Sequence, residues 1–433
     1  MRLFLILAVQ FYMVVWSFCS AGAHNLPDTG QIKCYQIVSP YAEIPCSGTT
    51  GQDGEYDINP MSYTDNGNGT VTDDNTGLMW QKCTVGQTNF TDCSGGTAAT
   101  YTWYLASGTP DDIYNPLGAT NICGSLNLGG HTGDWRLPTD QELQTIVDYA
   151  IPSPGPMIRT AYFPNTIAYD YWSSTSIADN PNSAWYMGFS GGYVHYYHKD
   201  SPYHVRCVRG GQPAQSFTDN VNGTVTDYKT GLVWQQDGPT DVKTCKDALS
   251  YCEGLNLGGH DDWRLPNAKE LKSLVDSSRY NPSINPIYFP NAVASYYWSS
   301  TTVAQADYPV YAWYVDFNYG DVFGSIYKYN TYYARCVRGE QAGSLNIVRL
   351  MQGVNIGNSF ENIQDAYNNA QAGDIIQAKA VALTENQTFV ATKAVSLKGG
   401  YDSGFNPTSG FTTINGNMTI IGGTVTVQNI IIN

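Results

Sequence analysis

The sequence is poor in charged residues, and the charges that it has are mostly negative. Charged residues make up 14% of the 433 residues, with 22 Lys and Arg against 37 Asp and Glu, so the net charge is −15. An acidic chain repels a phosphate backbone. The composition therefore argues against nucleic acid as a partner.

Long hydrophobic runs are absent beyond the N-terminus, so the sequence predicts no transmembrane segment. The N-terminus has a basic Arg2, an apolar stretch over 3–16 and an Ala-Gly-Ala cleavage signal at 21–23. This pattern predicts a secretory signal peptide over residues 1–23. Cys19 leaves a lipoprotein open as an alternative. In either case we expect a secreted or cell-surface protein.

Tyrosine and glycine are abundant, with 33 and 43 residues, and 42% of the chain is hydrophobic. Few charges with many aromatic and glycine residues are typical of β-rich, loop-rich extracellular modules. The length predicts two to four domains.

The cysteines predict four disulfides, because an exported chain meets an oxidising environment. Cys123 and Cys207 are separated by the same number of residues as Cys252 and Cys336. This matched spacing predicts one long-range disulfide in each of two copies. Local bridges are expected between neighbours in the sequence: Cys34 with Cys46, in an N-terminal linker over 24–59, and Cys83 with Cys93. Cys245 is left over, either as a free thiol or for an intermolecular bond.

Two copies of one motif series predict two domains, over 60–210 and 214–340. Each copy contains the blocks GTVTD, LNLGGH, DWRLP, YFPN, YWSST and RCVRG in the same order. Copy one has extra residues between Trp80 and Cys123. We expect each copy to fold on its own.

The block that begins each copy reads as strands joined by tight Asn-Gly and Thr-Gly turns. A calcium loop is the alternative, and it needs carboxylates at both ends of the loop around a central glycine. With Gly69 as that glycine, Thr64 and Asn75 occupy the end positions, and the second copy fits no better. The sequence therefore favours plain hairpins.

The LNLGGH and DWRLP blocks predict a helix, a Gly-Gly stop and a second helix. The first helix has its apolar residues around Cys123 in copy one and around Cys252 in copy two. The second helix has the spacing of a capping box in both copies, Thr139 with Glu142 and Asn267 with Glu270. The arginine of DWRLP is expected to hydrogen-bond loop carbonyls, with ligand contact as the alternative.

Short aromatic strands follow, and they alternate in a way that suits an antiparallel sheet. In this order, the blocks resemble the Lcl C-terminal domain family of bacterial surface proteins over both copies. The resemblance implies a C-type-lectin-like α+β fold, export and, as in the best-known member, adhesion through sulfated glycosaminoglycans. The chain has no collagen-like repeat, and it lacks the Glu-Pro-Asn, Gln-Pro-Asp and Trp-Asn-Asp signatures of calcium-bridged sugar sites.

The last residues, 345–433, differ from the repeats. A capping helix is expected first, followed by Val, Ile and Thr strands alternating with Gly and Asn turns. This segment resembles the opening coils of a right-handed parallel β-helix. Its apolar end predicts an open strand edge, which is a possible site of self-association. The predicted fold class is thus α+β, with two C-type-lectin-like domains in tandem and a short β-helix-like segment.

The sequence shows no catalytic constellation, so we predict no enzyme, no cofactor and no metal site. His195, His198 and His204 have a spacing that admits a metal, but copy two has no histidine at the matching positions. The paired serines of YWSST are expected to satisfy backbone groups.

The predicted ligand-binding residues lie in a loop before the final strand of each copy, where the two copies differ but remain aromatic and polar. Aromatic faces and polar groups of this kind bind sugars. The predicted set is Tyr193, His195, Tyr196, Tyr197 and His198 in copy one, and Tyr319, Asp321, Tyr327 and Tyr329 in copy two. We predict an adhesin-like protein that binds extracellular glycan or another surface polymer. A structural or assembly protein that associates through 345–433 is the alternative.

Overall fold

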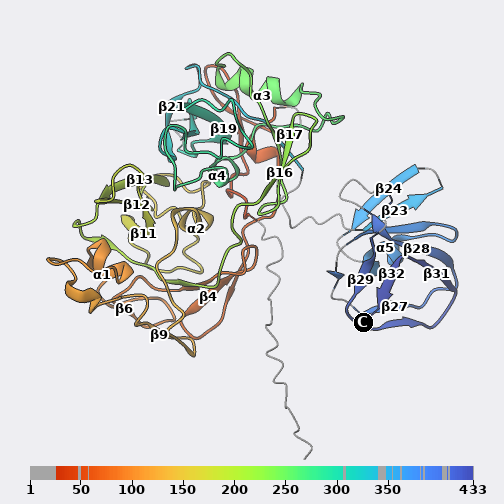
Figure 1. Cartoon of the computed structure of the whole chain (residues 1–433), viewed down its shortest axis with the longest axis horizontal. Helices are drawn as coiled ribbons and strands as arrows, with labels where there is room; N and C mark the ends of the chain where they lie inside the picture. Colours follow the sequence, from red (N-terminus) through yellow and green to blue (C-terminus); the bar gives the residue numbers. More distant parts are fainter. Residues whose placement is uncertain are drawn as a thin grey trace, which may run out of the picture.

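The structure is a computed structural model of the chain. It describes residues 26–46, 50–56, 58–305, 309–339, 348–353, 355–360, 363–380, 382–383, 386–401, 407 and 410–432. The signal peptide predicted over 1–23 lies outside the described residues. The two repeats and the C-terminal strands can be followed by colour in Figure 1.

Strands dominate the chain, and its helices are few and short. The N-terminal segment and first repeat contain β1 (Cys34–Tyr35), β2 (Glu43–Ile44), the 3-10 helix η1 (Asp53–Glu55), β3 (Tyr63–Asp65), β4 (Thr70–Asp73), β5 (Met79–Gln81), β6 (Gln87–Thr88), β7 (Gly95–Gly96), β8 (Thr100–Tyr101), α1 (Trp103–Ser107), η2 (Pro116–Gly118), β9 (Asn127–Leu128), β10 (His131–Thr132), α2 (Asp140–Thr145), β11 (Asp170–Ser176), β12 (Ser183–Gly188), β13 (Tyr193–His198), β14 (Tyr203–His204) and β15 (Val208–Arg209).

The second repeat contains β16 (Phe217–Asp219), β17 (Thr224–Asp227), β18 (Val233–Gln235), α3 (Cys245–Glu253), α4 (Ala268–Ser273), β19 (Tyr296–Thr302), β20 (Tyr311–Asp316), β21 (Asp321–Tyr327) and β22 (Val337–Arg338). The predicted α+β class is therefore wrong, because most regular structure is β and lies in several sheets.

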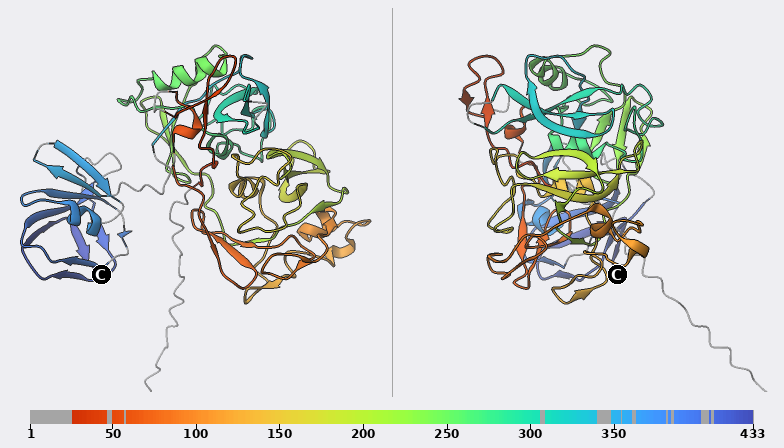
Figure 2. Two further views of the ribbon diagram at one scale, coloured as in Figure 1. Left: turned by 180° about the vertical axis from the view of Figure 1, so that it is seen from behind. Right: turned by 90° about the vertical axis from the view of Figure 1, so that its left-hand side faces the viewer.

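One eight-stranded sheet runs through both repeats in the order β19-β20-β21-β13-β12-β11-β14-β8. The repeats meet where β13 pairs antiparallel with β21, with Val194 opposite Val322. These two valines hold the same place in their repeats, after AWYMGF and AWYVDF. Equivalent residues that face each other in an antiparallel pair imply a pseudo-two-fold axis between them. Figures 1 and 2 show the repeats in contact, with β11, β12 and β13 beside β19 and β21.

The hairpins predicted at the start of each copy are confirmed. Strands β3, β4 and β5 pair in succession, as do β16, β17 and β18. The turn carboxylates already have protein partners: the Asp73 carboxylate accepts the amides of Asn75 and Thr76, and Asp65 pairs with Lys82 at 2.7 Å. Such side-chain to backbone bonds are what Asx turns use. Burial raises the pKa of Asp73 to about 6, against hydrogen bonds from Thr76.

All four predicted disulfides are confirmed, and Cys245 is free and buried. The bonds Cys123–Cys207 and Cys252–Cys336 tie the region before LNLGGH to the strand that ends each repeat.

The first predicted helix exists as a continuous helix only in repeat two. There α3 begins where the amide of Cys245 donates to Lys328 O at 3.0 Å. In repeat one α1 begins at the matching point, where the amide of Trp103 donates to Lys199 O at 2.9 Å, but it ends at Gly108. The chain then makes an excursion before Ile122 returns to bond Leu105 O. The insertion in copy one thus interrupts the helix, and the helix predicted around Cys123 is wrong.

The second predicted helix is confirmed in both copies, as α2 and α4, each with a complete capping box. Both helices pack under the eight-stranded sheet and contact each other. Their apolar residues join a single buried core that takes residues from both repeats, including Trp185 and Val194 from one and Trp313 and Val322 from the other. This shared core argues against independent folding of the copies.

The N-terminal segment joins both repeats to each other. Asp53 accepts hydrogen bonds from Thr29 Oγ1 at 2.6 Å and from Thr301 Oγ1 of repeat two at 2.7 Å. Lys269 Nζ donates to Asp28 O at 2.7 Å and to Thr145 O of repeat one at 2.9 Å. The sequence predicted a linker here, but this segment is part of the interface between the repeats.

The C-terminal region contains β23 (Val348–Gln352), β24 (Asn355–Phe360), α5 (Ile363–Asn369), β25 (Ile375–Lys379), β26 (Ala382–Leu383), β27 (Gln387–Phe389), β28 (Ala394–Tyr401), β29 (Thr412–Ile414), β30 (Met418–Ile420), β31 (Thr424–Gln428) and β32 (Ile430–Ile432). It has its own core. Its strands form three open sheets, in the orders β24-β23-β25-β28-β31, β26-β29-β32 and β27-β30. Among the described residues these sheets form no closed sheet or solenoid, so the predicted β-helix is wrong.

Candidate ligand-binding face

Strand alternation places the predicted ligand residues of copy one on two opposite faces. In β13, Val194 and Tyr196 pack on the shared core. Tyr193, His195 and Tyr197 therefore point to the other face of the sheet, because successive side chains of a strand alternate. The sequence placed these residues in a loop, but they lie in a central strand of the sheet.

Across the repeat boundary, β21 alternates in the same way. Val322 is in the shared core, so Asp321 and Phe323 lie on the face that has Tyr193 and His195. Because Val194 faces Val322, His195 lies beside Asp321 and Tyr193 beside Phe323. The His195 ring and the Asp321 carboxylate are 2.5 Å apart. The Tyr193 and Phe323 ring centroids are 6.3 Å apart, and the ring planes differ by 23°.

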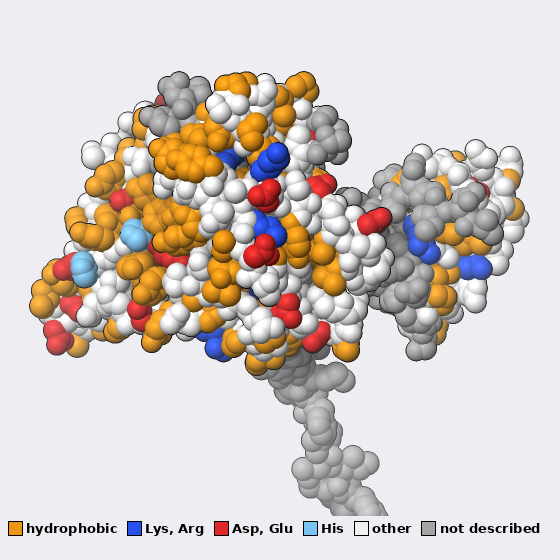
Figure 3. Space-filling model, turned by 90° about the horizontal axis from the view of Figure 1, so that it is seen from above, with side chains coloured by type: hydrophobic (Ala, Val, Ile, Leu, Met, Phe, Trp, Pro, Cys, Tyr) orange, Lys and Arg blue, Asp and Glu red, His pale blue; other side chains and the backbone are white. Residues whose placement is uncertain are grey.

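Aromatic rings continue outward from this boundary in both directions. We call this surface the aromatic face, and it consists of Tyr186, Tyr193, His195 and Tyr203 of repeat one and Tyr296, Tyr314, Phe323 and Tyr332 of repeat two. Figure 3 shows hydrophobic side chains, tyrosines included, gathered in patches on the surface of the repeats.

The rings of the aromatic face follow one another without a gap. In repeat one, the ring centroid of Tyr186 lies 5.0 Å from that of Tyr203 and 6.1 Å from that of Tyr193. In repeat two, Tyr314 lies 6.1 Å from Phe323 and 5.0 Å from Tyr296. These separations are those of interacting aromatic pairs. Tyr186 and Tyr314 are nearly buried at the floor, and the other rings are partly exposed.

Carboxylates lie among these rings in both repeats. The Tyr193 hydroxyl donates to Asp170 Oδ1 at 3.1 Å, and the Asn318 side chain donates to Asp316 at 2.6 Å. Burial raises the pKa of Asp170 and of Asp316, in spite of these hydrogen bonds. Burial likewise raises the pKa of Tyr186, so its hydroxyl stays protonated.

Of the other predicted residues, Asp321 lies beside His195 and the Tyr197 ring centroid lies 6.2 Å from that of Tyr203, whereas the rest do not join this face. Tyr196 packs against the core and lies 6.0 Å from Tyr319, measured between ring centroids. Tyr327 and Tyr329 stack on each other at 4.8 Å, at the far end of β21. His198 is exposed at the end of β13. His204, one of the three histidines considered for a metal, has a protein partner at one ring nitrogen, because its Nδ1 lies 3.1 Å from Ala99 O.

Sequence reasoning missed most of this face and both carboxylates, namely Tyr186, Tyr203, Tyr296, Tyr314, Phe323, Tyr332, Asp170 and Asp316. Tyr186 and Tyr314 follow the buried Trp of AWYMGF and AWYVDF, so strand alternation alone placed each on the side of the sheet opposite the shared core, where Tyr186 belongs to a second buried cluster. No comparable signal marked the pairing of β13 with β21.

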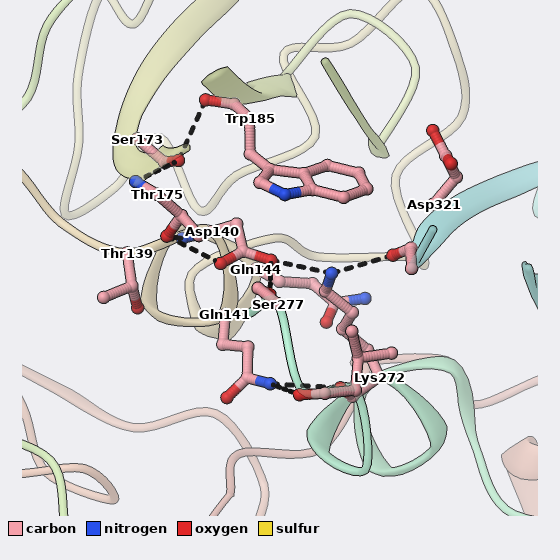
Figure 4. A network of polar contacts seen from close by, with 12 residues as sticks. Thr139, Asp140, Gln141, Gln144, Ser173, Thr175, Trp185, Lys272, Ser277 and Asp321 are labelled. Atoms are coloured by element: carbon pink, nitrogen blue, oxygen red, sulfur yellow. Dashed lines mark hydrogen bonds and ion pairs between the residues drawn. The ribbon is translucent and has the colours of Figure 1, made fainter. Parts of the chain in front are cut away.

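A buried ion pair holds the repeats together beneath the sheet (Figure 4). Lys272 of α4 lies 2.7 Å from Asp140 of α2, and their side chains are 0% and 2% exposed. Lys272 also donates to Gly320 O at 2.8 Å, and Asp140 accepts from Thr175 at 2.9 Å. Burial opposes ionisation of Asp140, but Lys272 and the hydrogen bonds from Thr175 and Ser277 together lower its pKa.

A cavity of about 670 Å³ lies beside this ion pair, between the two repeats. Its polar lining is paired within the protein. Gln141 Oε1 accepts from Lys229 at 2.8 Å, and Gln141 Nε2 donates to Val275 O at 2.8 Å. The cavity therefore belongs to the interface that holds the sheet together.

The arginine of DWRLP has the structural role that we expected. Arg136 binds Glu142 of the capping box at 2.7 and 2.6 Å and donates to Gly210 O at 2.8 Å. Arg264 binds Glu270 in the same way, at 2.7 Å for both bonds.

Two copies of one module that share a sheet, with an open aromatic face across their boundary, define a tandem-repeat protein suited to binding at a surface. Both copies match the Lcl C-terminal domain, at residues 69–209 and 223–338, and the chain belongs to this family. The family indicates a surface-associated, adhesin-like protein. No curated protein matches the chain. None of the helices in the described part of the chain is long and apolar enough to cross a membrane.

Proposed function

We propose that the protein is exported and binds an extracellular glycan or other surface polymer through the aromatic face. The observation that supports this most is the continuous row of rings from Tyr203 to Tyr296, which crosses from one repeat to the other. Flat rings stack on the C–H faces of sugars, while the nearby carboxylates accept hydrogen bonds from hydroxyl groups. The protein acts by binding and not by catalysis.

The face fits an extended ligand better than a small one. The strands that carry its rings are β14, β12, β13, β21, β20 and β19. They follow one another in one sheet, except that β11 lies between β12 and β14. A polymer that crosses these strands contacts both repeats at once, so its affinity gains from several rings in one binding event.

A glycan array probed with the full chain tests this proposal. The variant Tyr193→Ala with Phe323→Ala removes the two rings at the repeat boundary and should lose binding. The matched control is Tyr280→Ala, because this side chain is 52% exposed and lies outside the aromatic face. Binding that survives in the double variant, with an unchanged melting temperature, would place the site elsewhere.

Self-association is the second candidate, and exposed apolar side chains of the C-terminal region favour it. Ile421, Ile431 and Ile432 are 70%, 42% and 49% exposed. Strand β31 is the last strand of its sheet, and an unpaired edge is a template for association. Sedimentation of the full chain over a range of concentrations tests this: a monomer throughout contradicts it. The boundaries 60–210, 214–340 and 345–433 stay predictions.

A further inference from the structure

We infer that the aromatic face selects a polysaccharide with protonated amino groups. This inference rests on the proposed function and specifies the ligand of the same site. Three features support it: the carboxylates among the rings, the absence of Lys and Arg from the described strands β11, β12, β13, β19, β20 and β21, and the pseudo-two-fold relation of the two repeats.

Each repeat places one carboxylate beside tyrosine rings, and Asp170 is buried whereas Asp316 is partly buried. Asp170 accepts a hydrogen bond from the Tyr193 hydroxyl in repeat one. In repeat two Asp316 lies opposite Tyr296 in the strand pair, on the same side of β20 as Tyr314. A cation is attracted both to the face of an aromatic ring and to a carboxylate. Tyrosines with a carboxylate among them thus suit an ammonium group.

The two carboxylates are not at equivalent sequence positions, but the sheet brings them to corresponding places. Asp170 on β11 faces Gly188 on β12, whereas in repeat two Tyr296 on β19 faces Asp316 on β20. The carboxylate thus lies on the first strand of the pair in repeat one and on the second strand in repeat two, but at the same level of the pair. Each half of the face therefore has one carboxylate, and Asp321 lies between them beside His195.

The outward positions of these strands hold no lysine or arginine. In β11, β12, β13, β19, β20 and β21 the residues that alternate with the core are aromatic, acidic, small or histidine, and none of these six described strands contains Lys or Arg. Nearby lysines serve other contacts: Lys199 donates to Ser176 and Pro181 O, and Lys328 donates to Thr302. A face without positive charge repels sulfate groups, as does the net charge of −15.

The repetition of the site favours a repeating ligand. Two ring-and-carboxylate clusters lie on either side of the axis between Val194 and Val322, four strands apart in the sheet, and this suits a polymer with amines along its length. A polymer that engages both clusters binds more tightly than one that engages a single cluster, because the second binding event is intramolecular. A polymer of amino sugars supplies amines at regular spacing together with the C–H faces that stack on tyrosine.

The test compares two matched hexasaccharides, of glucosamine and of N-acetylglucosamine, by calorimetry with the full chain at slightly acidic pH. The two differ at the nitrogen, where a charged ammonium group in one is a neutral N-acetyl amide in the other. We expect the amine form to bind about tenfold more tightly, with an affinity that falls as salt rises. The variant Asp170→Asn with Asp316→Asn should abolish this preference, because it removes charge but keeps shape. The exposed Asp112→Asn is the control.

Equal affinity for the two hexasaccharides, or tighter binding of the acetylated one, overturns the inference, as does a preference that persists in the double Asn variant. A tetralysine peptide that binds as tightly as the amine form overturns the assignment to a polysaccharide. If the glycan array shows neutral or sulfated ligands that depend on Tyr193 and Phe323, only this inference fails. If the array shows no ligand, the proposed function fails with it.

Discussion

Replacement of Asp140 by alanine is expected to destabilise the protein strongly. Asp140 and Lys272 are almost fully buried and 2.7 Å apart, so Asp140→Ala leaves an ammonium group in the interior without its carboxylate. Breaking a buried ion pair by removing one partner costs about 3–5 kcal/mol. Thr175 also loses its acceptor, and this adds to the loss.

The chain itself contains the uncharged alternative at the pseudo-symmetric site. Ala268 occupies in α4 the place of Asp140 in α2, and Gln144 occupies the place of Lys272. There Gln144 Nε2 reaches Ala268 O at 3.5 Å and Tyr149 at 2.8 Å. The double variant Asp140→Ala with Lys272→Gln copies this arrangement, so it should recover most of the loss, because replacing both partners of a buried pair is often nearly neutral.

Urea unfolding of the full chain, followed by tryptophan fluorescence, measures both effects. The expected order of unfolding free energies is wild type near the double variant, with both single variants about 3–5 kcal/mol lower. A double variant as unstable as the sum of the singles refutes the reasoning, since it would show that the two charges do not compensate each other across the interface.

Three further outcomes follow from burial and charge. Tyr196→Ala should lower the melting temperature but leave polymer binding unchanged, because Tyr196 packs on the core; loss of binding with an intact fold would contradict this placement. Burial raises the pKa of Asp53 to about 6 in spite of hydrogen bonds from Thr29 and Thr301. An acid with a raised pKa contributes stability at low pH that is lost as pH rises through that value, so Asp53→Asn should gain about 1–3 kcal/mol relative to wild type between about pH 4 and pH 7, as urea unfolding at each pH can measure. If the difference in unfolding free energy between the variant and wild type does not change with pH, Asp53 does not titrate in this range. Burial also raises the pKa of Cys245 to about 11, so iodoacetamide should label it only after unfolding. Rapid labelling of the native protein would contradict its burial.

Local features were predictable because their signals lie within a short stretch of sequence. The matched spacing of the cysteines gave the two long-range disulfides, and closeness in the sequence gave the two local ones. The Thr139–Glu142 spacing gave a capping box that the structure contains. The helix around Cys123 was predicted wrongly because both copies were interpreted as having the same helix before LNLGGH. The insertion that begins at Gly108 ends the helix early in repeat one, and no periodicity reveals where an insertion enters.

The candidate site was predictable only in part, because it depends on contacts between distant strands. Tyr193, His195 and Asp321 were found, since they are aromatic or polar where the copies differ. Nothing in either copy shows that Val194 meets Val322, and this one pairing joins two separate sets of residues into one face. If residues 193–198 had been predicted as a strand, Tyr193 and Tyr196 would have been assigned to opposite faces of the sheet. The tyrosines and histidines of this stretch resembled a polar loop instead.

The central claim is that both repeats build one binding site. A double-mutant cycle on polymer affinity, with Tyr193→Ala and Phe323→Ala in the full chain, tests it most directly. The two rings stack across the repeat boundary, so their effects on binding free energy should be non-additive, and the stoichiometry should be one polymer per chain. Additive effects, with two polymers bound to each chain, would show that each repeat has a separate site and would contradict the account.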